Sequence, residues 1–535
     1  MGRTGTKGQR LRADRVTRLT VGDAAEVFLL PLVLFRIVGA QTLVLLAVPL
    51  TLFLIMQFVG DTMWERPTFR NVRLLIRAER QGEARTYRKH MVLFGTLAGV
   101  AVTVLMLLLH SILYGEYAQR FGNRLLLLIL APALICVGAA AGKKGFLRAV
   151  GAGPVVRLVN MLKTILLLVF PCLFGGLAAH YGSKVDALLL TDRYASIYGM
   201  SGVLAGISLT EVIVLILFLL SERRYRAQDL FSMRGERGSG YAFLSLEGLF
   251  ALIIPAVICF DLWDFFRGTP AEEMTTAEFV DVFGRYIGCA IAPTLFAGCL
   301  LTIPFILPVY QVHAGYQHDD IPSALDRFAQ MVRHAMITLL PAAFCICALA
   351  VPLVTLFIGH QDDDVSLLMR VQILAVPLFT MSLILSILFQ KFGGLKILLI
   401  AAAAGSAVHI GAVFIAAAAP GAYAYLIAHF AGILVFLVVT GLFLSASLSY
   451  RQEWVHGFLI PCISALIPAL PLFALAPALS TILGELLTIL ILAPFYLVIY
   501  VILLTMLHGV TEYELYHIPG GRILTGLVGI LGGNR

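Results

Sequence analysis

The feature that most constrains this chain is a series of long apolar runs separated by short polar breaks. Each run is close to the ~20 residues that a helix needs to cross ~30 Å of hydrocarbon at ~1.5 Å per residue. The sequence therefore predicts an all-α polytopic membrane protein with about 14 transmembrane helices. The predicted spans are Val21–Val38, Thr42–Gly60, Met91–Leu113, Leu125–Ala141, Val155–Ala179, Tyr198–Leu220, Tyr241–Phe260, Tyr286–Pro308, Ala335–Ile358, Leu368–Phe389, Ile397–Ala419, Tyr423–Leu444, Phe458–Leu479 and Leu486–Leu507.

The composition agrees with this prediction. Of the 535 residues, 60% are hydrophobic and 13% are charged, about half the charged share of an ordinary soluble protein. So few charges cannot coat the surfaces of several soluble domains, which excludes a soluble enzyme, a disordered chain and a coiled coil. The eight cysteines all fall inside apolar runs without metal-type spacing, so we expect neither disulfides nor a metal site.

The basic residues predict the orientation in the membrane. If the N-terminal tail is cytosolic, 30 of the 39 Lys and Arg residues fall in cytosolic segments. Such a bias predicts that both chain ends are cytosolic, N-in and C-in. The basic excess (the net charge is +8) then faces anionic membrane lipids, and we expect no nucleic-acid partner.

The chain divides into two six-helix lobes with similar spacing. Glu83-Ala84 and Ser323-Ala324 precede the third and ninth spans about 240 residues apart, and Gly153 and Gly393 open the fifth and eleventh. An even number of helices per copy gives two copies of the same orientation, as in parallel-repeat transporters. The predicted divisions are a basic cytosolic tail (1–20), an N-terminal lobe (21–220), a cytosolic linker (221–240), a C-terminal lobe (241–444), two additional helices (445–507) and a cytosolic tail (508–535).

Motifs for nucleotide or metal chemistry are missing from the sequence. The stretch Gly138–Lys144 is one residue short of a phosphate-binding loop and lacks its Ser or Thr, so we interpret it as a small-residue helix end with basic flanks. No HExxH or GxSxG motif occurs. His409 and His429 lie in different spans, where polar helix packing is the ordinary role. We therefore expect no catalytic residues, no cofactor and no nucleotide, and a protein that is not an enzyme.

Charges inside the spans are the candidate functional residues, because an ionisable group at the centre of a bilayer costs roughly 2.5–3.5 kcal/mol on insertion scales. The Arg36 guanidinium can donate two parallel hydrogen bonds to phosphate oxygens. Lys163 can reach a phosphate or a carboxylate, and the long side chain of Arg285 can extend to a lipid headgroup. Basic groups would suit an anionic lipid-pyrophosphate head, whereas acidic groups would suit cationic drugs or a coupling cation. Both types are present, so charge alone leaves the substrate open. The candidates are Glu26, Arg36, Lys163, Glu211, Glu247 and Arg285.

Four stretches resemble the multidrug/oligosaccharidyl-lipid/polysaccharide (MOP) exporter superfamily. Within it they are most similar to the polysaccharide and lipid II flippases, including the stage V sporulation protein B-like proteins. The four stretches are Arg36–Gln41 with Val48–Leu50, Gly142–Val169, Ala324–Gly359, and Gly509–Leu515 with Ile518–Gly521. The resemblance implies a two-lobed bundle that opens alternately to each side of the membrane.

The resemblance also implies a function. A flippase of this family moves undecaprenyl-pyrophosphate-linked saccharide or peptidoglycan precursor across the bacterial cytoplasmic membrane, with membrane lipids and a coupling cation as further partners. The alternative is a cation-coupled multidrug antiporter of the same fold, which would need a cavity carboxylate such as Glu247. A membrane polymerase or ligase of surface sugars should have a substantial outer loop, and the longest one here, Asp261–Arg285, is short and mainly acidic.

Overall fold

The structure is a computed structural model, and it is helical throughout its described part. The described residues are 30–114, 124–226, 283–317, 321–392, 394–416, 423–448, 450 and 452–510, with scattered positions between 253 and 281. Two compact units emerge, an N-terminal unit over Gly22–Gly284 and a C-terminal unit that contains Arg285 and all that follows. Within the described ranges, eleven helices are long and apolar enough to cross a membrane. The predicted all-α polytopic fold is therefore confirmed.

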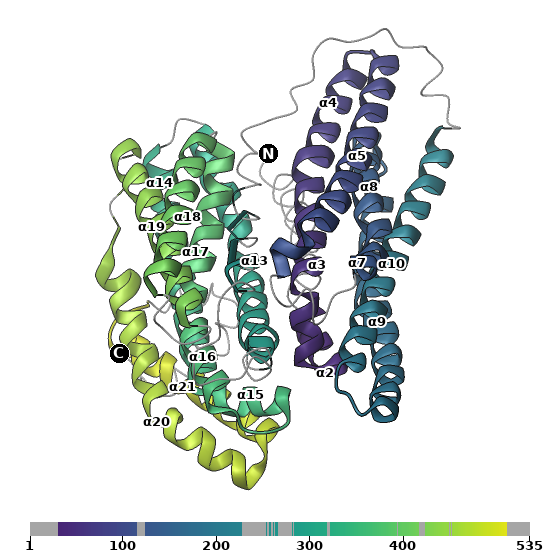
Figure 1. Cartoon of the computed structure of the whole chain (residues 1–535). Coiled ribbons are helices and arrows are strands. Elements are labelled where there is room, and N and C mark those ends of the chain that lie inside the picture. Colours follow the sequence, from purple (N-terminus) through teal and green to yellow (C-terminus); the bar gives the residue numbers. More distant parts are fainter. Residues whose placement is uncertain are drawn as a thin grey trace. The chain divides into compact units, whose positions relative to one another are not determined.

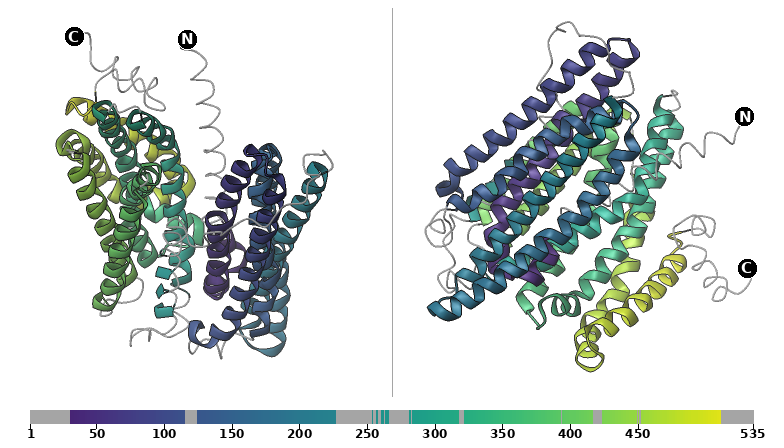
Figure 2. Two further views of the ribbon diagram at one scale, coloured as in Figure 1. Left: turned by 90° about the horizontal axis from the view of Figure 1, so that it is seen from above. Right: turned by 90° about the vertical axis from the view of Figure 1, so that its right-hand side faces the viewer.

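The helices of the N-terminal unit run roughly along one common direction (Figures 1 and 2). They are α2 (Leu30–Val38), α3 (Ala40–Val59), the π-helical turn η2 (Gly60–Glu65), α4 (Arg66–Arg77), α5 (Gln81–Tyr114), α7 (Arg124–Leu127), the 3-10 turn η3 (Leu128–Leu130), α8 (Ala131–Ala149), α9 (Gly153–Leu189) and α10 (Tyr194–Arg226).

Local chemistry explains where these helices break. Gly39 has φ +83°, a left-handed conformation that favours glycine, and it separates α2 from α3 at the predicted break. The end of α9 is fixed by Asp186, whose carboxylate accepts hydrogen bonds from Thr191 Oγ1 and from the backbone N–H groups of Tyr194 and Ala195. The Asp186 side chain therefore satisfies N–H groups at the start of α10 and sets the α9–α10 hairpin.

The helix that begins at Ala40 continues without interruption to Arg77, through η2 and α4. The polar segment between the second and third predicted spans, Asp61–His90, is thus helical on both sides of a short turn at Ala78–Arg80. Glu79 in this turn has φ +60°, which is uncommon for a residue other than glycine. This continuity matters because it carries the acidic residues that follow Val59 along the same helix axis.

Close helix packing in this unit depends on glycine. Gly95 of α5 and Gly138 of α8 face each other so closely that a Cβ on Gly95 would lie 2.2 Å from the carbonyl oxygen of Gly138. The predicted small-residue stretch Gly138–Lys144 is accordingly part of α8, inside the bundle. Small residues at such contacts allow backbones to approach each other in membranes.

The C-terminal unit contains a second set of helices and two additional ones (Figure 1). They are the π-helical turn η4 (Tyr286–Ile291), α13 (Ala292–Gln317), α14 (Ile321–Ala348), α15 (Ala350–Ile358), α16 (Asp363–Ile373), α17 (Val376–Phe392), α18 (Leu395–Ile415), α19 (Tyr423–Leu448), the π-helical turn η6 (Val455–Leu459), α20 (Ile460–Leu483) and α21 (Glu485–Met506).

Two tyrosines and one arginine attach the last helices to this unit. Tyr496 donates its hydroxyl to the carbonyl of Ala465 (2.9 Å), which joins α21 to α20. Tyr500 donates to the carbonyl of Ile337 on α14 (2.8 Å). Arg333 donates to the carbonyl of Gly509 beyond α21 (2.8 Å). The two tyrosine contacts satisfy buried polar groups in an otherwise apolar cluster.

The order of helices repeats between the two units. The helix α14 begins 240 residues after α5, which is the predicted spacing, and α18 begins 242 residues after α9. In both units the helix that follows packs closely against its predecessor: α10 packs against α9, and α19 packs against α18. The six-plus-six duplication as a whole stays a prediction, because most of the seventh span lies outside the described residues.

Several predictions fall outside the described residues. These are the tail 1–20, most of the linker 221–240, most of the seventh span and nearly all of the tail that follows Leu507. The division into lobes, linker and tails, and the N-in/C-in orientation, stay predictions.

Candidate functional site

Nine charged side chains of the N-terminal unit form three groups of ion pairs between its helices, and we name the whole set the charge network. Seven of the nine are buried, and the two others are Asp61 and Arg148. Ionisable groups within membrane-spanning helices are rare, pair with each other and mark functional sites. The members are Asp61, Glu65, Arg88, Lys143, Lys144, Arg148, Lys163, Glu211 and Glu222.

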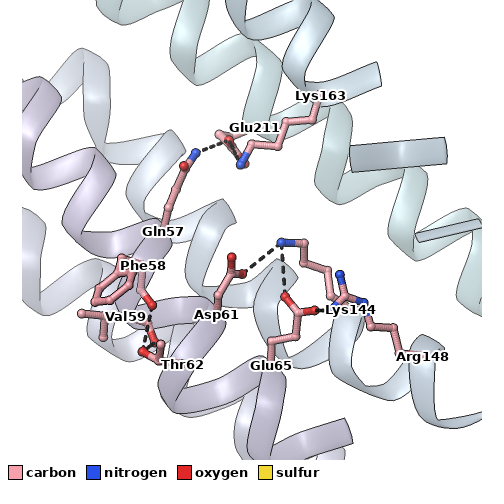
Figure 3. Close-up of polar contacts among 10 residues, drawn as sticks. All are labelled: Gln57, Phe58, Val59, Asp61, Thr62, Glu65, Lys144, Arg148, Lys163 and Glu211. Atoms are coloured by element: carbon pink, nitrogen blue, oxygen red, sulfur yellow. Dashed lines mark hydrogen bonds and ion pairs between the residues drawn. The ribbon is translucent and has the colours of Figure 1, made fainter. Parts of the chain in front are cut away.

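One end of the charge network joins three helices through a single carboxylate (Figure 3). Lys163 Nζ of α9 lies 3.3 Å from Glu211 Oε1 of α10. Gln57 Nε2 of α3 donates to the same oxygen, also at 3.3 Å. Glu211 is only 1% exposed, so its charge is held by Lys163 and by a neutral amide. Removing Lys163 would take away a cation that lies 3.3 Å from the buried Glu211 carboxylate.

The middle of the charge network lies along η2, one turn further on (Figure 3). Lys144 Nζ of α8 contacts Asp61 Oδ1 at 3.0 Å and Glu65 Oε2 at 3.3 Å. Arg148, one turn beyond Lys144, pairs with the other oxygen of Glu65. The Asp61 side chain is 45% exposed, so this group is accessible from outside the unit's core.

The far end of the charge network is centred on Glu222, near the end of α10. Lys143 Nζ of α8 contacts Glu222 Oε2 at 2.9 Å, and Arg88 of α5 pairs with Glu222 Oε1. The Arg88 guanidinium also lies over the Phe146 ring, 5.1 Å from its centroid. Glu222 is 1% exposed, so two cations on two helices converge on one buried carboxylate.

The sequence of α8 explains how one helix contributes to both the middle and the far end of this network. Consecutive residues on an α-helix point about 100° apart, so Lys143 faces α10 while Lys144 faces η2. Gly145 follows them, and a Cβ there would lie 2.4 Å from the carbonyl oxygen of Glu65. The absence of a side chain at this position thus lets α8 approach η2 closely enough for Lys144 and Arg148 to reach their carboxylates.

The structure brings together two of the six predicted candidates, Lys163 and Glu211. Arg36 lies elsewhere, exposed in the last turn of α2. Its neighbours Ile37 and Val38 pack near Gly176 and Gly175 of α9. Those glycines follow Lys163 by 12 and 13 residues, roughly 18 Å along the helix axis. Arg36 is therefore near the other end of the unit.

The remaining candidates are placed differently. Glu26 and Glu247 lie outside the described residues. Arg285 belongs to the C-terminal unit, where its Nη1 donates to Asp362 Oδ2 at 3.0 Å. The same Asp362 caps α16 by accepting from the N–H of Val365. The Arg285 charge is thus engaged by a carboxylate of its own unit.

Seven members of the charge network were not among the predicted candidates. They fall in segments that hydropathy assigns to the cytosol, and they are Asp61, Glu65, Arg88, Lys143, Lys144, Arg148 and Glu222. One signal for part of this set is present in the sequence: Gln57, Asp61 and Glu65 recur every four residues, as do Lys144 and Arg148. That spacing places each series on one face of a helix, provided that the helix continues beyond its apolar part.

The charge network combines five basic and four acidic side chains, so it carries one positive formal charge in excess. Arginine and lysine are the residues that bind phosphate, by forked hydrogen bonds and as a point charge respectively. An arrangement of this kind can bind an anion by exchanging a protein carboxylate for a ligand oxygen. The carboxylates can equally release or take up a cation.

Comparison with solved structures identifies the fold. A multidrug resistance MATE family transporter of the MOP superfamily, in an inward-facing conformation, matches with a TM-score of 0.59 at 15% identity over 81% of this chain and 98% of that one. The lipid II flippase MurJ, in an inward closed conformation, matches with a TM-score of 0.51 at 12% identity over 92% and 98%. A eukaryotic MATE transporter matches with a TM-score of 0.52 at 11% identity over 87% and 100%. No protein-family profile and no curated protein sequence matches the chain.

The chain therefore has the fold of the MOP superfamily, as the sequence resemblance predicted. It is a multi-pass membrane protein. The solved structures with this fold include both drug transporters and a lipid flippase, and the fold alone favours neither branch.

Proposed function

We propose that this protein is a transporter that moves an anionic lipid-linked saccharide, carried on undecaprenyl pyrophosphate, across the bacterial cytoplasmic membrane by alternating access. The MOP fold supports the transport step, because the similar solved structures are transporters and a flippase. The excess positive charge inside the N-terminal unit supports the anionic cargo.

The observation that carries this proposal is the depth of the charge network. The helix α3 has 20 residues and spans about 30 Å, enough to cross the hydrocarbon by itself. Asp61 and Glu65 follow it and so lie at the boundary that the basic residues predict to be cytosolic. Gln57, which contacts Glu211, lies one turn inside that boundary. In the predicted N-in orientation, the network would therefore lie at the depth of the pyrophosphate of a lipid in the inner leaflet.

Competition between carboxylate and phosphate is the proposed binding step. The Glu211 carboxylate is paired with Lys163, and Lys144 is paired with both Asp61 and Glu65. A pyrophosphate carries more negative charge than either carboxylate, so it can replace a carboxylate beside Lys163 or Lys144. The freed carboxylate then has to find another partner or a proton, which couples binding to rearrangement of α9 and α10 around it.

Arg36 is proposed as a second contact for the same cargo. In the predicted N-in orientation the end of α2 lies at the outer boundary, opposite to the charge network. An exposed guanidinium there can receive the pyrophosphate after translocation. The other candidate cavity residues stay Glu26, Glu247 and Arg285. A cargo phosphate at Arg285 would have to replace its hydrogen bond to Asp362.

The alternative function is a cation-coupled multidrug antiporter. Glu211 is the observation that favours it, because a carboxylate that is 1% exposed and shared between Lys163 and Gln57 can hold a proton or a metal cation in place of the lysine contact. In this reading the cargo is a cation, and the exchange at Glu211 drives its export. Neither proposal assigns catalysis to the protein.

Reconstitution into liposomes tests the two proposals side by side. One assay measures flipping of a fluorescent undecaprenyl-pyrophosphate saccharide, and the other measures uptake of a cationic dye driven by a proton or sodium gradient. We expect flipping by the wild-type protein and a reduction of at least tenfold in Lys163→Gln. Lys396→Gln, which changes an exposed lysine at the start of α18, is the matched control and should flip at the wild-type rate.

The double variant Lys163→Gln/Glu211→Gln protects this test against misfolding, because it removes both charges together and leaves two groups that can hydrogen-bond. It should fold and still flip slowly. Gradient-driven dye transport without lipid flipping by the wild-type protein would replace the flippase proposal with the antiporter.

A further inference from the structure

Arg370 of the C-terminal unit is an arginine at the edge of a membrane-spanning segment. It belongs to α16, and α16 and α17 together form the candidate span Asp363–Gln390. From Arg370 to Gln390 is about 20 residues, or ~30 Å along the helix axis, which equals the thickness of the hydrocarbon. If Gln390 lies at one boundary, Arg370 lies at the other, where the phosphates of lipids are found.

The surroundings of Arg370 hold it in one place. Cys347 of α14 donates its thiol to the backbone carbonyl of Arg370 at 3.4 Å, which attaches this turn of α16 to α14. The guanidinium lies over the ring of Phe473 from α20, 5.3 Å from the ring centroid. Phe473 in turn packs against the apolar cluster of Cys347, Ile373 and Val376. Three helices thus fix the arginine and the aromatic ring on which it lies.

Within the described residues no carboxylate pairs with this guanidinium. Its Nε is buried and donates no hydrogen bond. The acidic residues at the start of α16 are about two turns away along the helix, and two of them have other partners: Asp362 accepts from Arg285, and Asp363 accepts from Gln361 Nε2 at 2.8 Å. Arg285 and Arg333 differ from Arg370 in this respect, because each of them donates a hydrogen bond to an oxygen of its own unit.

An arginine so placed needs an anion from elsewhere. The guanidinium is planar and always charged, and its N–H groups match the oxygens of a phosphate in a forked geometry. The Phe473 ring contributes a cation–π contact on one face but accepts no hydrogen bond in the plane of the guanidinium. That plane is therefore the side on which a ligand can bind.

We propose that Arg370, seated on Phe473, binds the phosphate of a lipid at a boundary of the membrane. Two sources have this chemistry, the headgroup of an ordinary anionic phospholipid and the pyrophosphate of a polyprenyl carrier. The site does not depend on the proposed transport function, because binding of either lipid can be measured without transport.

Lipid titration by native mass spectrometry tests this proposal on the purified full-length chain in phospholipid-free detergent. The two probes are dioleoyl phosphatidylglycerol and farnesyl pyrophosphate. We expect Arg370→Gln to weaken binding of at least one probe at least tenfold. Arg370→Lys keeps the positive charge but loses the paired hydrogen bonds of the guanidinium, so it should weaken binding severalfold. Phe473→Leu should have a similar effect. Lys396→Gln, an exposed lysine of the same unit, should bind as the wild-type protein does.

The pattern of losses identifies the source of the phosphate. A loss for phosphatidylglycerol alone assigns the site to a phospholipid, a loss for farnesyl pyrophosphate alone assigns it to the carrier, and a loss for both defines a general phosphate site. The same affinity for both probes in Arg370→Gln and in the wild-type protein would overturn the proposal. If Arg370→Gln does not fold, unchanged affinities in Arg370→Lys and Phe473→Leu would overturn it as well.

Discussion

The hairpins α9–α10 and α18–α19 occupy equivalent places in their units but hold different chemistry. The first hairpin is joined by the ion pair of Lys163 and Glu211, at 3.3 Å. The second places His409 beside His429, with ring centroids 5.1 Å apart. Each pair connects two neighbouring helices within their membrane-spanning parts. The difference shows that a repeated helix order preserves packing without preserving charge, and of the two hairpins it makes α9–α10 the one in which we expect charge-dependent transport.

The largest expected effect comes from Glu222, which holds two cations of the charge network. Glu222→Ala leaves Arg88 and Lys143 without their shared carboxylate, and removing one partner of a buried ion pair typically costs about 3–5 kcal/mol. We expect a large drop in the melting temperature of the purified protein. The melting temperature is measured by tryptophan fluorescence or by the reaction of exposed cysteines with a thiol-reactive dye. A melting temperature equal to that of the wild-type protein would show that the network is not needed for stability.

A smaller effect is expected where α8 approaches η2. Gly145→Ala places a Cβ 2.4 Å from the carbonyl oxygen of Glu65, which is backbone and cannot swing away, so overpacking should cost about 1–3 kcal/mol. Gly441→Ala in α19 is the matched control, because a Cβ there meets no atom within 4 Å. In that helix interior alanine should stabilise by roughly 0.5–1 kcal/mol. Equal melting temperatures for the two variants would contradict the different packing of the two positions.

The exchange Lys163→Glu/Glu211→Lys tests whether the position of the positive charge matters or only the presence of an ion pair. It keeps the pair and moves the cation from α9 to α10. If Lys163 contacts the cargo, flipping should stay at least tenfold slower than in the wild-type protein, which corresponds to about 1.4 kcal/mol. Full activity of the exchanged protein would show that the pair is structural only.

The smallest effect is expected in the C-terminal hairpin. His409→Gln keeps a polar side chain that can still hydrogen-bond beside His429, so flipping at neutral pH should change less than twofold. The measurement is the same liposome assay, with Lys163→Gln as the sensitive reference. A loss as large as that of Lys163→Gln would remove the proposed functional difference between the two units.

The sequence predicted the fold more fully than the site. Hydropathy located the helices, Gly39 marked a real break, and the 240-residue spacing anticipated the start of α14. Lys163 and Glu211 were also recognised as candidates, because each interrupts an apolar run. Asp61, Lys144 and Glu222 were assigned to the cytosol instead, because a hydropathy average falls wherever charges cluster, even when the helix continues.

What the sequence determined by itself is therefore the local part: which segments are apolar enough to enter a membrane, where a glycine breaks an apolar run, and which charges stand out within such a run. Those properties depend on residues close together in the chain. Only the tertiary structure decided that Lys144 meets Asp61, 83 residues away, and that Arg370 lies over Phe473. Such pairings depend on how each helix is rotated and how closely glycines such as Gly145 let it approach its neighbours, and no local property of the chain contains that information.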